Sequence, residues 1–242
     1  MYPLPPEFAF LKGKILSSRV YPEFFALHSE ERVLNVGFGD GPQAVVYAGT
    51  FGSMIGVDVN PERLDRARRM LASVGISNVN LVTANVEQLP VLDGAFDVVM
   101  AVDIIEHVEH PDLFVQELWR VLLPGGRLLI TFPAMHDRFV DTVSAVSRRV
   151  RRRPLRAHAE AWHPDDHQRE LLVGEWRSIV EKPGFRFMRS RATTMFPPLH
   201  LYGVPRFWFS NPVIHALDRR IAALPGVQRL GQTIMAVFEK PA

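Results

Sequence analysis

The chain has 242 residues and no cysteine, which excludes disulfide bonds and metal sites built from thiolates. No apolar run approaches the ~18 residues of a membrane span, and the N-terminal MYPLPPEFAF lacks the basic, apolar and small-residue regions of a secretory signal. The formal net charge is only +2, so overall charge does not indicate a nucleic-acid binder. We therefore expect a cytoplasmic protein with one main domain.

Basic residues are nevertheless concentrated in one place. The segment RRVRRRPLR, residues 148–156, contains six arginines and no acidic residue, so the rest of the chain is net acidic. A solvated helix end is one interpretation of such a run, and attraction of an anionic acceptor or a membrane surface is another. Nucleic acid is not the expected partner, because only this short segment is basic.

What the sequence does contain is a regular alternation of short β-rich runs and amphipathic segments. Strands are predicted at residues 32–36, 53–59, 79–83, 96–102 and, after a PGG turn, 127–132. Helices are predicted to begin at Pro42, to follow Asn60 as an N-cap and end at Gly75, and to span 111–122. This alternation is typical of a doubly wound parallel sheet. Beyond residue 132 we expect helices near 138–152 and 171–182, and strands near 185–193 and 232–239.

The first predicted strand runs into the segment VGFGDGP, in which Gly37, Gly39 and Gly41 alternate with other residues. Ligands of such sheets bind beyond the carboxyl ends of the strands, which is where these glycines lie. Glycine lets the backbone approach a ligand closely and permits positive φ, although an ordinary tight turn is the alternative. Asp58 ends the second strand, where a carboxylate can accept hydrogen bonds from both hydroxyls of a ribose. A cofactor that contains a nucleoside is therefore implied.

The spacing of the glycines bears on which nucleoside cofactor binds. A dinucleotide site requires G-x-G-x-x-G, and its third glycine would fall on Pro42. The spacing here is G-x-G-x-G, which suits a ligand without a pyrophosphate. A nicotinamide-dependent oxidoreductase stays open as an alternative that Pro42 opposes.

Several separate segments resemble the class I S-adenosylmethionine-dependent methyltransferases. VLNVGFGDG is similar to their first motif, GVDVNPERLDRAR to the ribose-binding strand and next helix, and the stretch from TANVEQLP to LLITFP to the region between adenine contact and fifth strand. The resemblance covers residues 30–133 and is closest to the subgroup that acts on small molecules, lipids and sugars. It implies a Rossmann-like, doubly wound, mostly parallel seven-stranded sheet. On this basis residues 1–242 form a single methyltransferase domain, with a cofactor-binding core at 30–133 and a helical C-terminal cover on the acceptor side at 134–231.

The resemblance also assigns residues to the cofactor, which it identifies as S-adenosylmethionine. The glycines line its methionine portion, Asp58 holds its ribose, and Asn85 with Val86 meets the adenine edge. Asn35 and Asn85 stand where the family commonly has an acidic residue, and Phe38 stands where Cys is common. The two asparagines lose a charge but keep hydrogen-bonding capacity, which predicts weaker cofactor binding and leaves a non-catalytic S-adenosylmethionine-binding protein as a second alternative. The residues predicted to bind the cofactor are Asn35, Gly37, Gly39, Gly41, Asp58, Val59, Asn85, Val86 and Val102.

Methyl transfer needs no metal, because the cofactor already carries the reactive methyl group. An oxygen or nitrogen acceptor still has a proton to lose, and Asp103 and His107, after the fourth strand, are the candidate catalytic residues. A purely local structural role is the alternative for His107. The segment HPDDH, residues 163–167, contains two His and two Asp but lacks a further element that would complete a metal site, and by resemblance it contributes a His to the acceptor side.

The candidate acceptor-binding residues are His136, His167 and Tyr202. The aromatic and proline-rich stretch 195–217 suits a lid over a greasy acceptor, with core packing or a dimer contact as the alternative. We predict a methyltransferase that acts on a small-molecule, lipid-linked or sugar acceptor, preferably an amphipathic one with an anionic or hydroxylated head. Peripheral membrane contact and a homodimer are its possible further associations.

Overall fold

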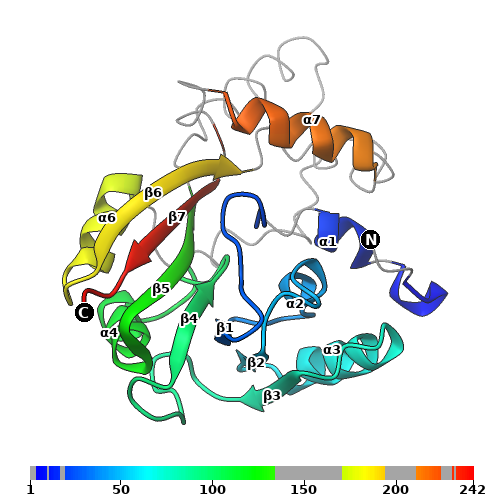
Figure 1. Cartoon of the computed structure of the whole chain (residues 1–242), viewed down its shortest axis with the longest axis horizontal. Helices are drawn as coiled ribbons and strands as arrows, with labels where there is room; N and C mark the ends of the chain where they lie inside the picture. The colour runs from blue at the N-terminus through cyan, green and yellow to red at the C-terminus, as the bar shows by residue number, and fades with distance from the viewer. Residues whose placement is uncertain are drawn as a thin grey trace, which may run out of the picture.

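The computed structural model describes residues 4–9, 11–16, 20–133, 171–193, 211–224, 231 and 233–242. Within these residues the chain forms a seven-stranded sheet of order β3-β2-β1-β4-β5-β7-β6 (Figure 1). Strands β1 to β5 are parallel to one another, and β7 is antiparallel to its neighbours β5 and β6. The strands are β1 Arg32–Val36, β2 Ser53–Asp58, β3 Val79–Thr83, β4 Phe96–Ala101, β5 Leu122–Pro133, β6 Arg186–Thr193 and β7 Thr233–Glu239. The predicted mostly parallel, doubly wound sheet is confirmed.

Helices α2, α3, α4 and α7 each begin at a proline, and α3 and α7 are also capped by an asparagine. Asn60 Oδ1 accepts a hydrogen bond from Arg63 N at 3.1 Å, and Asn211 Oδ1 accepts one from Val213 N at 2.9 Å. A proline follows each of these asparagines and fits the first helical turn. None of the helices that the structure describes is long and apolar enough to cross a membrane. They are α1 Leu11–Leu16, α2 Pro42–Val46, α3 Pro61–Ser73, α4 Pro111–Val121, α6 Val173–Glu181 and α7 Pro212–Ala222, with a 3-10 turn at Pro6–Phe8.

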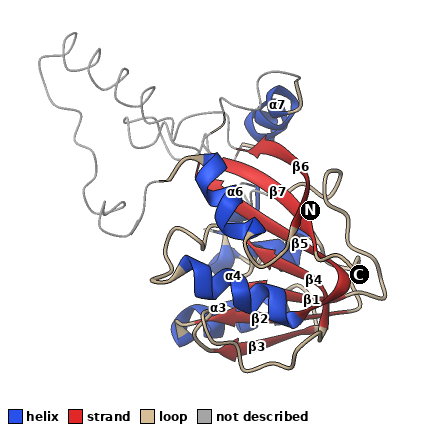
Figure 2. Cartoon of the chain, turned by 90° about the vertical axis from the view of Figure 1, so that its left-hand side faces the viewer, coloured by secondary structure: helices blue, strands red, loops and turns tan. Residues whose placement is uncertain are grey.

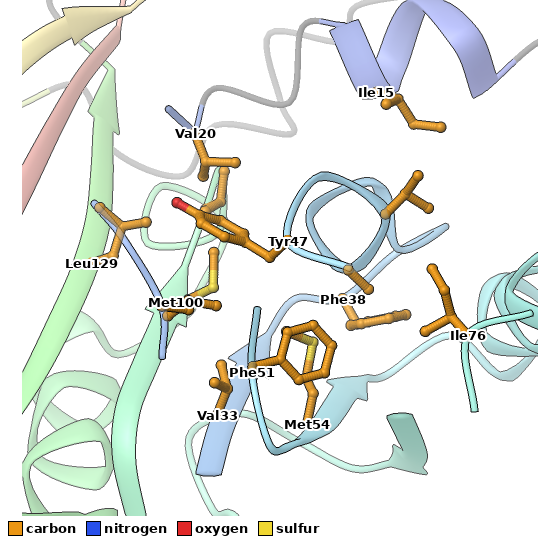
Figure 3. Packing of buried hydrophobic residues seen from close by; sticks show 14 of the residues in the cluster. Ile15, Val20, Val33, Phe38, Tyr47, Phe51, Met54, Ile76, Met100 and Leu129 are labelled. Carbon is orange, nitrogen blue, oxygen red and sulfur yellow. The ribbon is translucent and has the colours of Figure 1, made fainter. Parts of the chain in front are cut away.

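Two hydrophobic cores lie on opposite faces of the sheet. Side chains alternate along β1, so that Val33 packs with α1, α2 and α3, whereas Leu34 and Val36 pack with α4 and α6. Figure 2 shows α4 and α6 in front of the strands, and Figure 3 shows the first core, with Phe38, Phe51 and other labelled side chains. Because both faces are covered, ligands have access to the central strands from their ends.

The sequence predicts a turn at the PGG segment, but the structure includes this segment in strand β5. The pairing of β4 with β5 shifts from Phe96 opposite Leu122 to Val98 opposite Arg127, so the intervening residues bulge out of the ladder. Gly125, at φ +78°, donates its N–H to Lys240 O at 2.7 Å. The bulge is therefore fixed by the C-terminal end of the chain, a partner more than a hundred residues away.

Other predicted elements of the C-terminal part appear near their expected positions. Helix α6 and strands β6 and β7 correspond to the expected elements near 171–182, 185–193 and 232–239. The helix expected near 138–152 and most of the proposed cover at 134–231 lie outside the described residues. The division into a core and a cover therefore stays a prediction.

Candidate active site

The glycine loop between β1 and α2 is built around the buried side chain of Phe38. Gly37, Gly39 and Gly41 have φ values of +69°, +55° and +75°, a region that other residues rarely adopt. A Cβ atom at Gly41 would lie 2.7 Å from Phe38 Cε1, and one at Gly56 in β2 would also clash with that ring. A Cβ at Gly39 would meet no atom within 4 Å. Gly39 is thus the position where the loop is open to a ligand.

Asp58 holds this loop to the end of β2. Its Oδ2 accepts a hydrogen bond from Gly39 N at 2.8 Å, and its Oδ1 accepts one from Asn60 N at 2.9 Å. Each carboxylate oxygen has a further lone pair, so both can still accept a hydrogen bond from a ribose hydroxyl. The next residue, Val59, is 64% exposed although apolar, which leaves it available to a flat apolar ligand group.

The remaining residues predicted to bind the cofactor differ in their exposure and in their hydrogen bonds. Asn85 is exposed, and its Oδ1 accepts a hydrogen bond from Glu87 N at 2.9 Å. The side chains of Val86 and Val102 are buried in the two cores, so any cofactor contact from them comes from the backbone. Asn35 is buried at the base of the glycine loop, and its Nδ2 has no hydrogen-bond acceptor in the part of the chain that the structure describes.

The loop that carries Asn85 is tied to the start of helix α4. Glu87 accepts hydrogen bonds from His110 N at 2.9 Å and pairs with His110 Nδ1 at 3.0 Å. Burial raises the pKa of Glu87, but the hydrogen bonds from His110 and from the backbone of Glu109 outweigh it and hold the pKa below its usual value. Further along, Leu89 N donates to Glu117 Oε2 at 2.8 Å. These bonds fix the predicted adenine side of the site.

The candidate catalytic residues lie on the loop after β4. Asp103 has φ +53° and donates its N–H to Thr131 Oγ1 at 2.8 Å, while Thr131 Oγ1 donates to Asp103 Oδ1 at 3.2 Å. Ile104 packs against the glycine loop, because a Cβ at Gly37 would lie 3.0 Å from its Cδ1. His107 is exposed, in a turn closed by the bond from its N–H to Ile104 O at 2.9 Å. The structure thus brings the β4 loop against the glycine loop.

Ile104 and Thr131 were not identified from the sequence. The glycine at position 37 indicates that another residue lies close to this backbone, but the sequence does not show that this residue is Ile104. Thr131 is the single polar residue in the apolar run LLITF, which indicates a buried hydrogen bond but not its partner, Asp103.

The predicted acceptor side cannot be compared with the structure in the same way. His136, His167, Tyr202 and the segments 148–156 and 163–167 lie outside the described residues, as does most of 195–217. Within the described ranges, no group of three or more His, Asp or Glu side chains is placed to hold a metal. The described site therefore consists of an open glycine loop, the Asp58 carboxylate bonded to it and the Asp103 loop.

The loops of this site lie within a segment that is similar to known proteins. Residues 34–130 match the family model described as a methyltransferase domain. The ubiquinone/menaquinone biosynthesis C-methyltransferase UbiE of Pseudomonas putida is 35% identical over 112 residues, which are 45% of this chain and 44% of that protein. The chain thus spans less than half the length of the curated relatives it matches.

Solved structures with the same fold extend over nearly the whole chain. An S-adenosylmethionine-dependent methyltransferase from Methanosarcina mazei has a TM-score of 0.60 and 15% identity, and covers 92% of this chain and 98% of its own. The [4+2]-cyclase SpnF has a TM-score of 0.61 and 19% identity, with 95% and 80% covered. At these identities the likeness shows the fold alone. A cyclase among them illustrates that the fold does not fix the reaction.

The fold and the domain match agree with each other, because residues 34–130 match a methyltransferase domain and the whole sheet has the fold of an S-adenosylmethionine-dependent methyltransferase. Both similarities support S-adenosylmethionine as the cofactor that the glycine loop and Asp58 are expected to bind. The resemblance predicted from the sequence is confirmed, and a nicotinamide cofactor is not favoured. The assignment of individual residues to catalysis or binding stays a prediction.

Proposed function

We propose that the protein transfers the methyl group of S-adenosylmethionine to a small-molecule acceptor. The observation that carries this proposal is the joint geometry of Gly39 and Asp58, an open backbone position hydrogen-bonded to a carboxylate that retains lone pairs for a ribose. This geometry lies inside the segment that matches the methyltransferase domain.

The cofactor supplies a methyl group on a positively charged sulfur, and the acceptor displaces it in line. The bond from the acceptor to the methyl carbon forms as the carbon–sulfur bond breaks, its electron pair stays on sulfur, and the acceptor loses a proton. Thr131 fixes the backbone and carboxylate of Asp103, so this carboxylate is held at a defined place for orienting the acceptor or receiving that proton. His107, four residues further along the same loop, is the second candidate base.

The acceptor follows less directly from the same observations. We propose a small-molecule, lipid-linked or sugar acceptor, with quinone-type rings first among the compounds to assay because the curated relatives are named as C-methyltransferases of ubiquinone and menaquinone biosynthesis. The similarity to these relatives covers 112 residues, which are 45% of this chain. A cytoplasmic location, peripheral membrane contact and a homodimer belong to the proposal as expectations from the sequence.

Two measurements test the proposal. Calorimetry with S-adenosylhomocysteine and with NAD should show binding of the first and none of the second. Transfer of labelled methyl from S-adenosylmethionine to fractionated extract of the native host should then label a small-molecule fraction. Binding of S-adenosylhomocysteine without transfer to any fraction would favour the non-catalytic alternative.

A further inference from the structure

The last strand of the sheet carries two arginines on the face that packs against the N-terminal segment. Arg189 Nη2 donates to Phe24 O at 2.7 Å, and its guanidinium lies 5.0 Å from the centroid of the Phe24 ring. Arg191 Nη2 donates to Arg219 O of α7 at 2.7 Å, and its guanidinium lies 4.8 Å from the centroid of the Tyr21 ring. Both arginines thus hold neighbouring segments on the sheet, but these bonds do not use all the donors of Arg191.

Two buried polar atoms on this face have no hydrogen-bond partner among the residues that the structure describes. They are Arg191 Nε, in a side chain that is 12% exposed, and Thr193 Oγ1, in a residue that is fully buried. Glu23 forms ion pairs with this face, but its oxygens lie 3.8 Å from Arg191 Nη1 and 3.7 Å from Arg219 Nη1, beyond hydrogen-bond distance. A buried donor without an acceptor costs about 1–3 kcal/mol, so two of them on one strand face call for a ligand.

The sheet register places Arg191 two strands away from Thr131, the residue that binds Asp103. Thr131 of β5, Met235 of β7 and Arg191 of β6 lie in one row across the sheet. Strands lie ~4.8 Å apart, so Arg191 is roughly 10 Å from Thr131, which binds Asp103. Thr193 is the last residue of β6, which ends beside α7 in Figure 1. The two unpaired donors therefore belong to residues on the same face as Thr131 and near the same end of the sheet as the Asp103 loop.

We infer that Arg191 and Thr193 bind an oxyanion, a carboxylate or phosphate group, on the methyl acceptor. The guanidinium Nε–H and the Thr193 hydroxyl both donate, and a carboxylate or phosphate oxygen accepts several such bonds. An acceptor that binds Arg191 and Thr193 through its charged group, and contains one ring, is long enough for its opposite end to reach the Asp103 loop. This inference rests on the proposed function and specifies the acceptor within it. The sequence suggests segment 148–156 as the part of the chain that attracts an anionic acceptor. The inference adds an arginine of strand β6, Arg191, to that segment.

Two simple oxyanions serve as probes, with a neutral analogue as control. Benzoate and phenyl phosphate should raise the melting temperature of the protein saturated with S-adenosylhomocysteine, and benzyl alcohol should not. Thr193→Val and Arg191→Lys should each weaken binding of the better probe at least tenfold, and Thr193→Ser should restore it. Arg189→Lys is the matched control, since Arg189 lies on the same strand face, and it should bind the probe as the unmodified protein does.

Thr193→Val also gives a result that needs no ligand. Replacing an unpaired buried hydroxyl with a methyl group should leave the melting temperature of the free protein unchanged or raise it. A clear fall would show that the hydroxyl has a structural partner and would overturn the inference, as would the absence of probe binding or equal probe binding by all variants. Failure of S-adenosylhomocysteine to bind the unmodified protein would instead refute the proposed function.

Discussion

Substitution of Gly39 by alanine separates the cost of its backbone conformation from its role at the cofactor. Gly39 has φ +55°, and a Cβ placed there meets nothing within 4 Å, so the free protein bears only the conformational cost of about 1–2 kcal/mol. In the complex, the added methyl group projects into the space that we assign to the cofactor. We expect Gly39→Ala to weaken binding of S-adenosylhomocysteine at least tenfold, about 1.4 kcal/mol or more.

Gly49 provides a matched control for this experiment. It has φ +76° and equally open surroundings, but it lies after helix α2 and away from the strand ends. Gly49→Ala should therefore lose a similar amount of stability in denaturant unfolding and keep the full affinity in calorimetry. Equal affinities of both variants and of the unmodified protein would refute the placement of the cofactor against Gly39.

Three further predictions concern single side chains. Asp58→Asn should weaken S-adenosylhomocysteine binding by about 1.5–3 kcal/mol in calorimetry. The reason is that the carboxylate has two acceptor oxygens to share between the loop and the ribose, whereas an amide has one. Unchanged affinity would show that Asp58 is not part of the site. His107→Ala should lower kcat about 100-fold in the labelled-methyl assay and leave the cofactor Kd unchanged, and an equal loss of affinity would make His107 a cofactor contact. Glu87, whose pKa is lowered in the folded protein, should stabilise the fold above its ordinary pKa of 4.5 and lose this contribution as pH falls through the folded value. The melting temperature of Glu87→Gln should therefore lie below that of the unmodified protein at pH 7 and approach it in acid; a constant difference across this range would contradict the assignment.

The parts of the fold that follow from local signals were predicted well from the sequence. Strands 32–36 and 79–83 match β1 and β3, because each is a short β-rich run with clear boundaries. Asn60 caps α3 as expected, since the cap depends on a residue three positions away. The glycine spacing and Asp58 predicted only a cofactor with a nucleoside, and the choice of S-adenosylmethionine depended on the resemblance to known methyltransferases.

Features that depend on distant partners were not predicted. The bulge in β5 is fixed by Lys240, and the conformation of Asp103 is fixed by Thr131, a residue 28 positions away. The pairing of Arg191 with Arg219 and Tyr21 joins three separate parts of the chain. Such contacts depend on the order of strands in the sheet, which periodicity and turn signals do not determine.

The packing of Phe38 ties the binding loop to the interior of the protein. Its ring occupies the space above Gly56 and beneath Gly41, so the loop cannot change shape without opening the core between β2 and α3. The loop is consequently preorganised, and little of the binding free energy goes into ordering it. Met70 and Leu81 belong to the same core as the Phe38 ring and lie beside Gly41 and Gly56, respectively. A substitution at either residue can therefore shift the ring and change the affinity for the cofactor. Cofactor affinity in this protein should therefore depend on buried hydrophobic residues as well as on the loop itself.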